Sequence, residues 1–160
     1  MIIVLMGVTG CGKTSVGSML ATELGWTFYD ADDFHPPANV EKMRIGEPLN
    51  DSDRLPWLEK LRATLVSALN SGVDAVVACS ALKAAYRKYL LIDDRVRLVH
   101  LSGTRELIRL RLAERRGHYM NPGLVDSQFA ILEEPEQALK IDIDNPLTEI
   151  VRQIRSSLGI

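Results

Sequence analysis

The sequence has few cysteines, no long apolar run and no marked excess of one charge sign. Two cysteines among 160 residues are too few for a disulfide framework, which excludes a small disulfide-stabilised secreted domain. The apolar N-terminal run Ile2–Met6 stops at Gly7 and has no basic flank, so we expect neither a signal peptide nor a membrane span. The net charge of −2 argues against nucleic acid and anionic membranes as partners. We therefore expect a cytoplasmic protein with reduced thiols.

What is present is typical of one globular domain over residues 1–160, in which short apolar runs alternate with helical periodicity. The expected strands are Ile2–Met6, Trp26–Tyr29, Val73–Cys79, Val96–Leu101 and Leu139–Ile143. The expected helices are Lys13–Leu24, Ala38–Arg44, one capped by Asp53 with Pro56 in its first turn and ending at Gly72, Ala81–Leu91 capped by Ser80, Thr104–Arg116, Leu124–Leu132 and one opened by Pro146. This alternation predicts an α/β fold, a doubly wound five-stranded parallel sheet with helices on both faces.

The most specific motif lies directly after the first expected strand and matches G-x-x-x-x-G-K-[ST] at every fixed position. Its glycines allow the backbone to curl so that several N–H groups face one point, and the following helix adds its own N-terminal N–H groups. Such a nest binds a polyphosphate. The predicted nucleotide-binding residues are Gly7, Val8, Thr9, Gly10, Cys11, Gly12, Lys13 and Thr14.

Within this P-loop, Lys13 is expected to pair with the β- and γ-phosphates and the Thr14 hydroxyl to ligate Mg²⁺. No N-K-x-D element is present, which disfavours a GTPase, and the third expected strand ends in Cys79-Ser80 rather than in an acidic residue. Acidic residues follow the second strand instead, where Asp30 and Asp32 are expected to lie beside the phosphates. One of them would orient Mg²⁺ through water and the other would accept a proton from an attacking hydroxyl.

Beyond the P-loop, the sequence resembles the gluconate kinases (gluconokinases), a group of small P-loop sugar-acid kinases, over nearly its whole length. The two most particular stretches read HPxxNxxKM from His35 and GxPLNDxDRxPWL from Gly46. The likeness is also carried by Asp30–Pro36, Cys79–Lys83 with Tyr86-Arg87, 115–119, Ser127–Phe129 with Leu132–Pro135, and Asp142–Pro146. Two positions depart from the family pattern: Ala31 stands where glycine is usual and Cys11 where serine is common.

The resemblance implies a nucleoside-monophosphate-kinase-like fold with a small lid, and transfer of the γ-phosphoryl group of ATP to the terminal hydroxyl of D-gluconate. It implies a substrate-binding insertion at about residues 30–57 and a lid at about residues 115–128. ATP and Mg²⁺ are the implied cofactor set, with Thr14 and Asp30 on the metal. A homodimer is suggested by the resemblance alone.

The residue roles follow the same resemblance. Lys13, Asp32 and Arg115 are the expected catalytic residues, with Arg115, or Arg111 one turn before it, brought over the γ-phosphate by the lid. The expected substrate-binding residues are Asp32, His35, Arg54, Lys83, Arg87 and His118. Lys83 and Arg87 lie four residues apart on an expected helix, so both could face the crevice and bind the carboxylate. Whether His118 and Gln128 touch substrate or only close the lid is left open.

Two other functions remain open at this stage. A shikimate-kinase-like enzyme would share the acidic pair, but it would be expected to have a glycine-rich segment where Cys79–Lys83 stands. A nucleotide-binding regulatory module without catalysis would not need Asp30 and Asp32.

Overall fold

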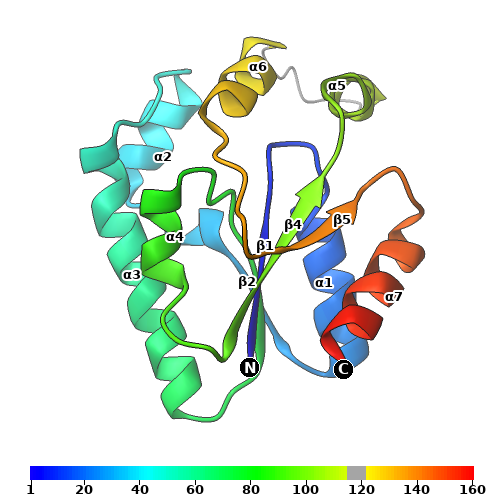
Figure 1. Ribbon diagram of the computed structural model, residues 1–160. Helices are drawn as coiled ribbons and strands as arrows, with labels where there is room; N and C mark the ends of the chain where they lie inside the picture. The colour runs from blue at the N-terminus through cyan, green and yellow to red at the C-terminus, as the bar shows by residue number, and fades with distance from the viewer. Residues whose placement is uncertain (115–121) are drawn as a thin grey trace.

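Five parallel strands form one open sheet in the order β2-β3-β1-β4-β5 (Figure 1). The computed structural model describes residues 1–114 and 122–160. The strands are β1 (Ile2–Met6), β2 (Thr27–Asp30), β3 (Ala75–Ala78), β4 (Val96–Ser102) and β5 (Leu139–Asp142). In the central register, Val4 lies beside Val77 of β3 and Leu98 of β4. The predicted doubly wound parallel sheet is confirmed.

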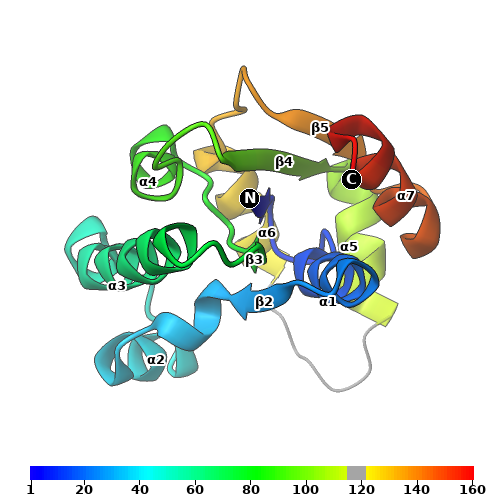
Figure 2. The ribbon, with the colours of Figure 1, turned by 90° about the horizontal axis from the view of Figure 1, so that it is seen from below.

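Helices cover both faces of this sheet. The helical elements are α1 (Lys13–Leu24), the 3₁₀ helix η1 (Ala31–Phe34), α2 (Pro37–Arg44), α3 (Asp51–Asn70), α4 (Ala84–Leu90), α5 (Arg105–Glu114), α6 (Pro122–Ile131) and α7 (Leu147–Leu158). Figure 2 shows α3 and α4 on one side of the strands and α1 and α7 on the other. The helices α2, α5 and α6 lie beyond the carboxyl ends of the strands (Figure 1), which is the edge where α/β proteins bind ligands.

The central strand β1 is buried because each of its faces packs against a different helical layer. Val4 and Met6 belong to the same apolar cluster as Leu61 of α3, whereas Ile3 and Leu5 belong to the cluster that contains Leu20 of α1. Burial on both faces explains why β1 is apolar at every position instead of alternating. Within the described residues 1–114 and 122–160, no helix is long and apolar enough to cross a membrane.

The start of α3 differs from the prediction. Asn50, rather than Asp53, caps this helix: the Asp53 amide donates to Asn50 Oδ1 at 2.8 Å, and the Asn50 amide donates to Asp53 Oδ2 at 3.0 Å. This reciprocal capping box satisfies two N–H groups that the helix itself cannot pair. The helix begins at Asp51, three residues earlier than a helix capped by Asp53 would begin. Pro56 is therefore its sixth residue and lies in the second turn.

The start of α4 was also predicted wrongly. Lys83, not Ser80, is its N-cap, and Ala81 has a φ of 44°, in the left-handed region that non-glycine residues rarely adopt. The Ser80 carbonyl instead accepts the Gly7 amide at 3.3 Å. The segment from Ser80 to Lys83 is therefore a loop that lies against the start of the P-loop, and this places Lys83 at the carboxyl edge of the sheet.

Candidate active site

The P-loop connects β1 to α1 with the backbone that its glycines were expected to provide. Gly10 and Gly12 have φ values of 80° and 94°, and α1 begins directly afterwards at Lys13. Lys13 Nζ donates to the Gly7 and Val8 carbonyls, each at 3.0 Å, so its ammonium group lies over the loop. A cation held above a curl of backbone N–H groups is the arrangement that receives the phosphates of a nucleotide.

Both helices that flank residues 115–121 contact this loop. The Thr9 amide donates to Gln128 Oε1 of α6 at 2.6 Å. On the other side, a Cβ atom added to Gly10 would lie 2.9 Å from Leu112 Cγ of α5, so glycine is needed for the close approach. The helices before and after residues 115–121 therefore both lie against the phosphate-binding loop.

The acidic pair at the end of β2 is tied to the P-loop through Asp30. The Thr14 hydroxyl donates to Asp30 Oδ2 at 2.9 Å, and the Asp32 amide donates to Asp30 Oδ1 at 3.1 Å. Asp32 keeps an exposed surface, but the protein packed around it displaces water, and this raises the pKa of its carboxyl group. The charge of Asp30 raises that pKa further, while His35 and Lys13 oppose the shift.

His35 is fixed next to this pair by an aromatic stack. Its ring lies 4.4 Å from the Trp57 ring at an interplanar angle of 14°, and the Trp57 indole donates to the Ala31 carbonyl at 2.6 Å. Burial lowers the pKa of His35, against the effect of the Asp32 charge, and the nearby Arg54 lowers it as well. The lowered pKa favours the neutral form of the His35 ring, which lies close enough to the Asp32 carboxylate and to the Arg54 cation to interact with both charges.

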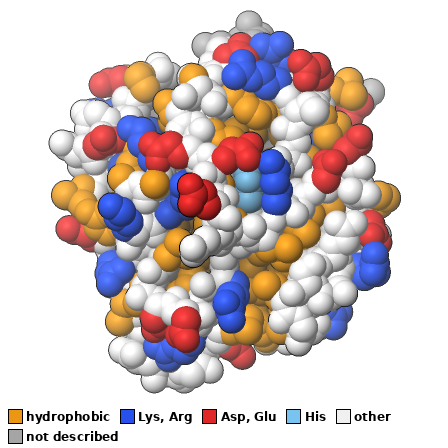
Figure 3. Space-filling view, in the orientation of Figure 1, with side chains coloured by type: hydrophobic (Ala, Val, Ile, Leu, Met, Phe, Trp, Pro, Cys, Tyr) orange, Lys and Arg blue, Asp and Glu red, His pale blue; other side chains and the backbone are white. Residues whose placement is uncertain are grey.

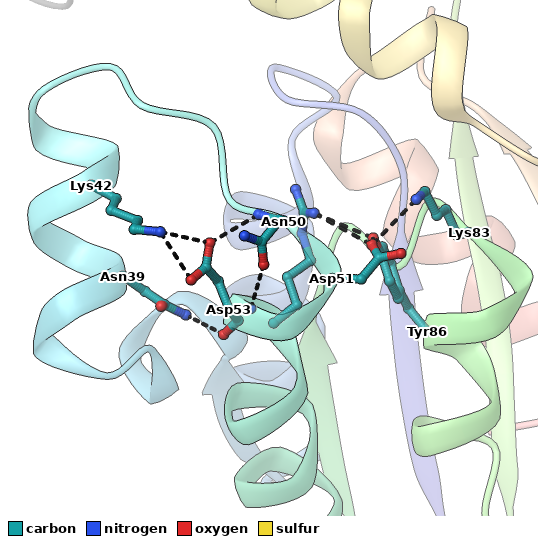
Figure 4. Close-up of polar contacts among 8 residues, drawn as sticks. Asn39, Lys42, Asn50, Asp51, Asp53, Lys83 and Tyr86 are labelled. Carbon is teal, nitrogen blue, oxygen red and sulfur yellow. Dashed lines mark hydrogen bonds and ion pairs between the residues drawn. The ribbon is translucent and has the colours of Figure 1, made fainter.

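A second charged cluster joins α3 to α4 (Figure 4). Tyr86 donates from its hydroxyl to Asp51 Oδ1 at 2.6 Å, and Lys83 Nζ donates to the same oxygen at 3.3 Å. Arg54 donates to the Tyr86 hydroxyl at 3.3 Å, and its guanidinium lies 5.5 Å from the centre of that ring. We call Asp51, Arg54, Lys83 and Tyr86 the cation cluster. It combines two positive charges, one negative charge and one phenol.

The helix α2 holds the start of α3, which carries half of this cluster. Asn39 is buried and donates to the Asp53 carbonyl at 2.7 Å, and Lys42 Nζ lies 3.0 Å from both carboxylate oxygens of Asp53 (Figure 4). Asn39 Nδ2 also lies 3.4 Å from His35 Nδ1. Asn39 and Lys42 of the HPxxNxxKM stretch therefore position the first turn of α3.

Arg87 lies apart from the cation cluster. It is buried, and its guanidinium donates to the carbonyls of Ala81 and Leu82 at 3.0 Å each. The loop is braced from the other side as well, because the Glu133 amide donates to the Leu82 carbonyl at 2.9 Å. The contacts of Arg87 thus support the left-handed turn that presents Lys83, whereas the sequence suggested a direct contact with substrate.

The remaining predicted site residues divide into those outside the described residues and those placed elsewhere. Arg115 and His118 lie outside the described residues. Arg111 donates to the Ile143 carbonyl after β5. Sequence reasoning assigned no role to Asp51 or Tyr86, although both stand inside the motif stretches that carry the family resemblance. Their positions in those stretches were the available signal.

Charges of both signs are interleaved over the face drawn in Figure 3, without a broad patch of one sign. The charges of the candidate site are instead local: a lysine over the P-loop, an acidic pair beside it, and the cation cluster between α3 and α4. Together with the parallel sheet, this arrangement defines a class, the P-loop kinases that phosphorylate small molecules.

The comparisons with known proteins narrow this class. The family model described as shikimate kinase matches residues 9–148. A probable gluconokinase of Xenopus tropicalis is 46% identical, with 99% of this chain and 93% of the relative covered. The gluconokinase of Gluconobacter oxydans is 48% identical, with 83% of this chain and 75% of the relative covered. The crystal structure of a gluconokinase from Sinorhizobium meliloti superposes with a TM-score of 0.86 at 40% identity, covering 98% of this chain and 90% of that one. The chain belongs to the gluconokinase family, within the shikimate-kinase-like P-loop kinases.

Proposed function

We propose that this kinase transfers the γ-phosphoryl group of ATP to the 6-hydroxyl of D-gluconate, giving 6-phosphogluconate and ADP. The observation that carries the proposal is the separation of a phosphate-binding loop from a cation cluster, with Asp32 and His35 between them. A sugar acid has its reacting hydroxyl at one end and its carboxylate at the other, and this arrangement has one group of residues for each end.

At the phosphate end, the N–H groups of the P-loop and the Lys13 ammonium group bind the triphosphate. Lys13 Nζ now lies on the Gly7 and Val8 carbonyls, so it can move a short way onto a phosphate oxygen without unfolding α1. Its charge then offsets the negative charge that develops on the transferred group.

The residues beside the P-loop fit a magnesium ion. Thr14 and Asp30 place a hydroxyl and a carboxylate oxygen 2.9 Å apart, and oxygen atoms are the ligands that Mg²⁺ prefers. No group of three His, Cys, Asp or Glu side chains forms a cage within residues 1–114 and 122–160, so Thr14 and Asp30 would share the ion with phosphate oxygens and water. When bound, the ion supplies charge neutralisation at the phosphates.

Asp32 is the proposed proton acceptor for the attacking hydroxyl. The raised pKa of its carboxyl group makes the carboxylate a stronger base than an ordinary aspartate. The neutral His35 ring, held against Trp57, is placed to hydrogen-bond a substrate hydroxyl and so orient the polyol chain. Asp32 would then take the proton as the oxygen attacks the γ-phosphorus.

At the acid end, Arg54 and Lys83 are the proposed ligands of the substrate carboxylate. The side chains of both residues are partly exposed, at 24% and 32%, and both lie near Asp51 Oδ1 and near the Tyr86 ring. Roles for Arg115 and His118 in a closing lid and a homodimer are further predictions that follow from the family resemblance, and a cytoplasmic location is the prediction from the composition.

The test is ADP release in a coupled assay with Mg-ATP against gluconate, other sugar acids, neutral polyols and shikimate. We expect turnover with gluconate well above the background of ATP hydrolysis, and little with glucitol, which differs from gluconate in lacking the carboxylate. Turnover with shikimate in place of gluconate would favour the alternative suggested by the family model. Background hydrolysis alone with every acid would contradict a kinase of small acids.

A further inference from the structure

The carboxylate of Asp51 occupies the place where a bound acid would find its donors. Its Oδ1 atom accepts from the Tyr86 hydroxyl at 2.6 Å and from Lys83 Nζ at 3.3 Å, and it lies 3.9 Å from Arg54 Nη1. These three donors come from partly or fully buried side chains, whereas the Asp51 side chain is 72% exposed. The donors are therefore embedded in the protein, and the acceptor is the outermost member of the cluster.

In this arrangement, the donor groups of two cations and a phenol are paired with a carboxylate of the protein itself. A sugar-acid carboxylate presents the same planar pair of oxygens, and the same donors would recognise it. The two positive charges of Arg54 and Lys83 exceed the one negative charge of Asp51, so the cluster keeps a net positive charge that attracts a second anion.

We propose that Asp51 is an internal competitor for the substrate carboxylate, which binds to Arg54, Lys83 and Tyr86 only as the Asp51 side chain leaves them. This inference rests on the proposed function. In this role, Asp51 weakens the binding of acids and so contributes to the KM for the acid substrate. It also disfavours acids that bind too weakly to displace it.

The Asp51 side chain can leave without disturbing the fold. It is the first residue of α3, where a negative charge is favourable next to the helix N-terminus whether it points to Lys83 or to water. The helix start is held independently by the Asn50–Asp53 capping box and by Lys42. The pKa of Asp51 is lowered by its hydrogen bonds from Tyr86 and then Lys83, so the group is ionised at neutral pH and competes as an anion.

The alternative role for Asp51 is to hold Arg54 and Lys83 in position for the substrate. The two roles predict opposite changes in KM, because removing a competitor tightens substrate binding whereas removing a support loosens it. A neutral polyol does not need the donors that Asp51 occupies, so both roles leave its kinetics unchanged, and it serves as the control for effects that do not act through the carboxylate.

The experiment compares Asp51→Asn and Asp51→Ala with the unchanged protein in steady-state assays on gluconate, ATP and glucitol. We expect the KM for gluconate to fall about two- to fivefold, the range that an exposed ion pair supports, with kcat and the KM for ATP unchanged. Glucitol kinetics should not change. The matched control is Glu149→Gln in α7, on the opposite face of the sheet. Like Asp51, Glu149 is an acid in the first turn of a helix and pairs with an arginine, Arg152. This variant should leave every kinetic parameter unchanged.

A KM for gluconate that rises or stays the same in both Asp51 variants would overturn the proposal that Asp51 competes with the substrate. A rise would assign Asp51 a positioning role. That result leaves the proposed function intact, because the unchanged protein still phosphorylates gluconate. If another sugar acid proves to be the substrate, the same comparison applies with that acid. If no acid is phosphorylated, the proposed function and this inference fail together.

Discussion

The phosphate end and the acid end of the site are built in opposite ways. The phosphate end is one continuous segment, Gly7 to Thr14, whose binding groups are mostly backbone N–H groups. The acid end consists of side chains from α3 and from the start of α4, and its bonded pairs Lys83–Asp51 and Tyr86–Asp51 are 32 and 35 residues apart in the chain. A local segment needs only its own dihedral angles to be correct, whereas the cation cluster exists only when α3 and α4 pack together.

The two ends also differ in how they are satisfied without substrate. At the phosphate end, the cation has neutral acceptors, because Lys13 lies on two backbone carbonyls, while the Thr14 hydroxyl donates to the Asp30 carboxylate. At the acid end, the acceptor is a charged carboxylate, Asp51. Charged pairs near the surface are screened by salt. We therefore expect added salt to weaken the binding of the substrate carboxylate at the acid end, and to leave the geometry of the P-loop largely unchanged.

Asp32 lies between the two ends, and its loss should have the largest effect. Asp32→Asn keeps the shape of the side chain but cannot accept the proton, so we expect kcat to fall about 100- to 10,000-fold. The KM for ATP should change little, because Lys13 and the P-loop are untouched. The control is Asp33→Asn at the next position of η1. A collapse of ATP affinity with kcat preserved would assign Asp32 to the phosphate end instead.

The second prediction tests whether the two ends are independent by removing a cation from the acid end. Lys83→Met or Arg54→Met should raise the KM for gluconate about 10- to 100-fold, the cost of losing a charged hydrogen bond. The KM for ATP should stay as it is. Lys60→Met, which removes a cation from the same helix α3 but one that lies over Phe34, serves as the control. A parallel rise in the KM for ATP would mean that the two ends are not independent.

Arg87→Met tests whether the acid end depends on a buried support. Methionine keeps the apolar stem but leaves the Ala81 and Leu82 carbonyls without this donor, so we expect the free energy of unfolding to fall by about 1–3 kcal/mol. Urea unfolding measures this change. Arg62→Met, which loses one bond to the Tyr89 carbonyl, should cost less. Equal losses in the two variants would show that Arg87 gives the loop no special support.

The smallest expected effect concerns the capping box below the acid end. The Asn50 amide, and next Lys42, lower the pKa of Asp53 from its ordinary value of 3.8. A lowered pKa in the folded state stabilises the protein above that ordinary value, and this stability is lost as the pH falls through the folded-state pKa. Asp53→Asn should therefore flatten the decline of Tm below a pH of about 4. Lys42→Met should flatten it less, because Asn50 remains, and equal slopes in both variants would contradict this order of causes.

Much of the fold and of the phosphate end could be predicted because their signals are local. The apolar runs, the helical periodicity and the P-loop pattern each describe one segment, and all five strands were found, with bounds within a few residues. The cap of α3 was missed although its signal is local, whereas the start of α4 depends in part on a residue far away in the chain. Helix α4 begins later than predicted because Ala81 adopts a left-handed backbone conformation. Arg87 donates to the Ala81 carbonyl and the Glu133 amide to the next carbonyl, and sequence periodicity does not reveal such contacts.

The spacing argument for Lys83 and Arg87 failed for the same reason. It assumed that both residues lie on one helical face, but α4 begins at Ala84, so Lys83 is its cap and points to Asp51 while Arg87 turns to the core. The partners of Lys83, in turn, come from α3.

The sequence by itself determined the strands, the P-loop and the acidic pair at the end of β2, because each depends on residues that are adjacent in the chain, and the alternation of strands with helices then indicated a parallel sheet. Only the tertiary structure decided which cations meet, that His35 is stacked on Trp57, and that Asp51 lies among the donors expected for a substrate. The reason is physical: backbone conformation follows from neighbouring residues, whereas the position of a charged side chain follows from whichever elements the burial of apolar surface brings together.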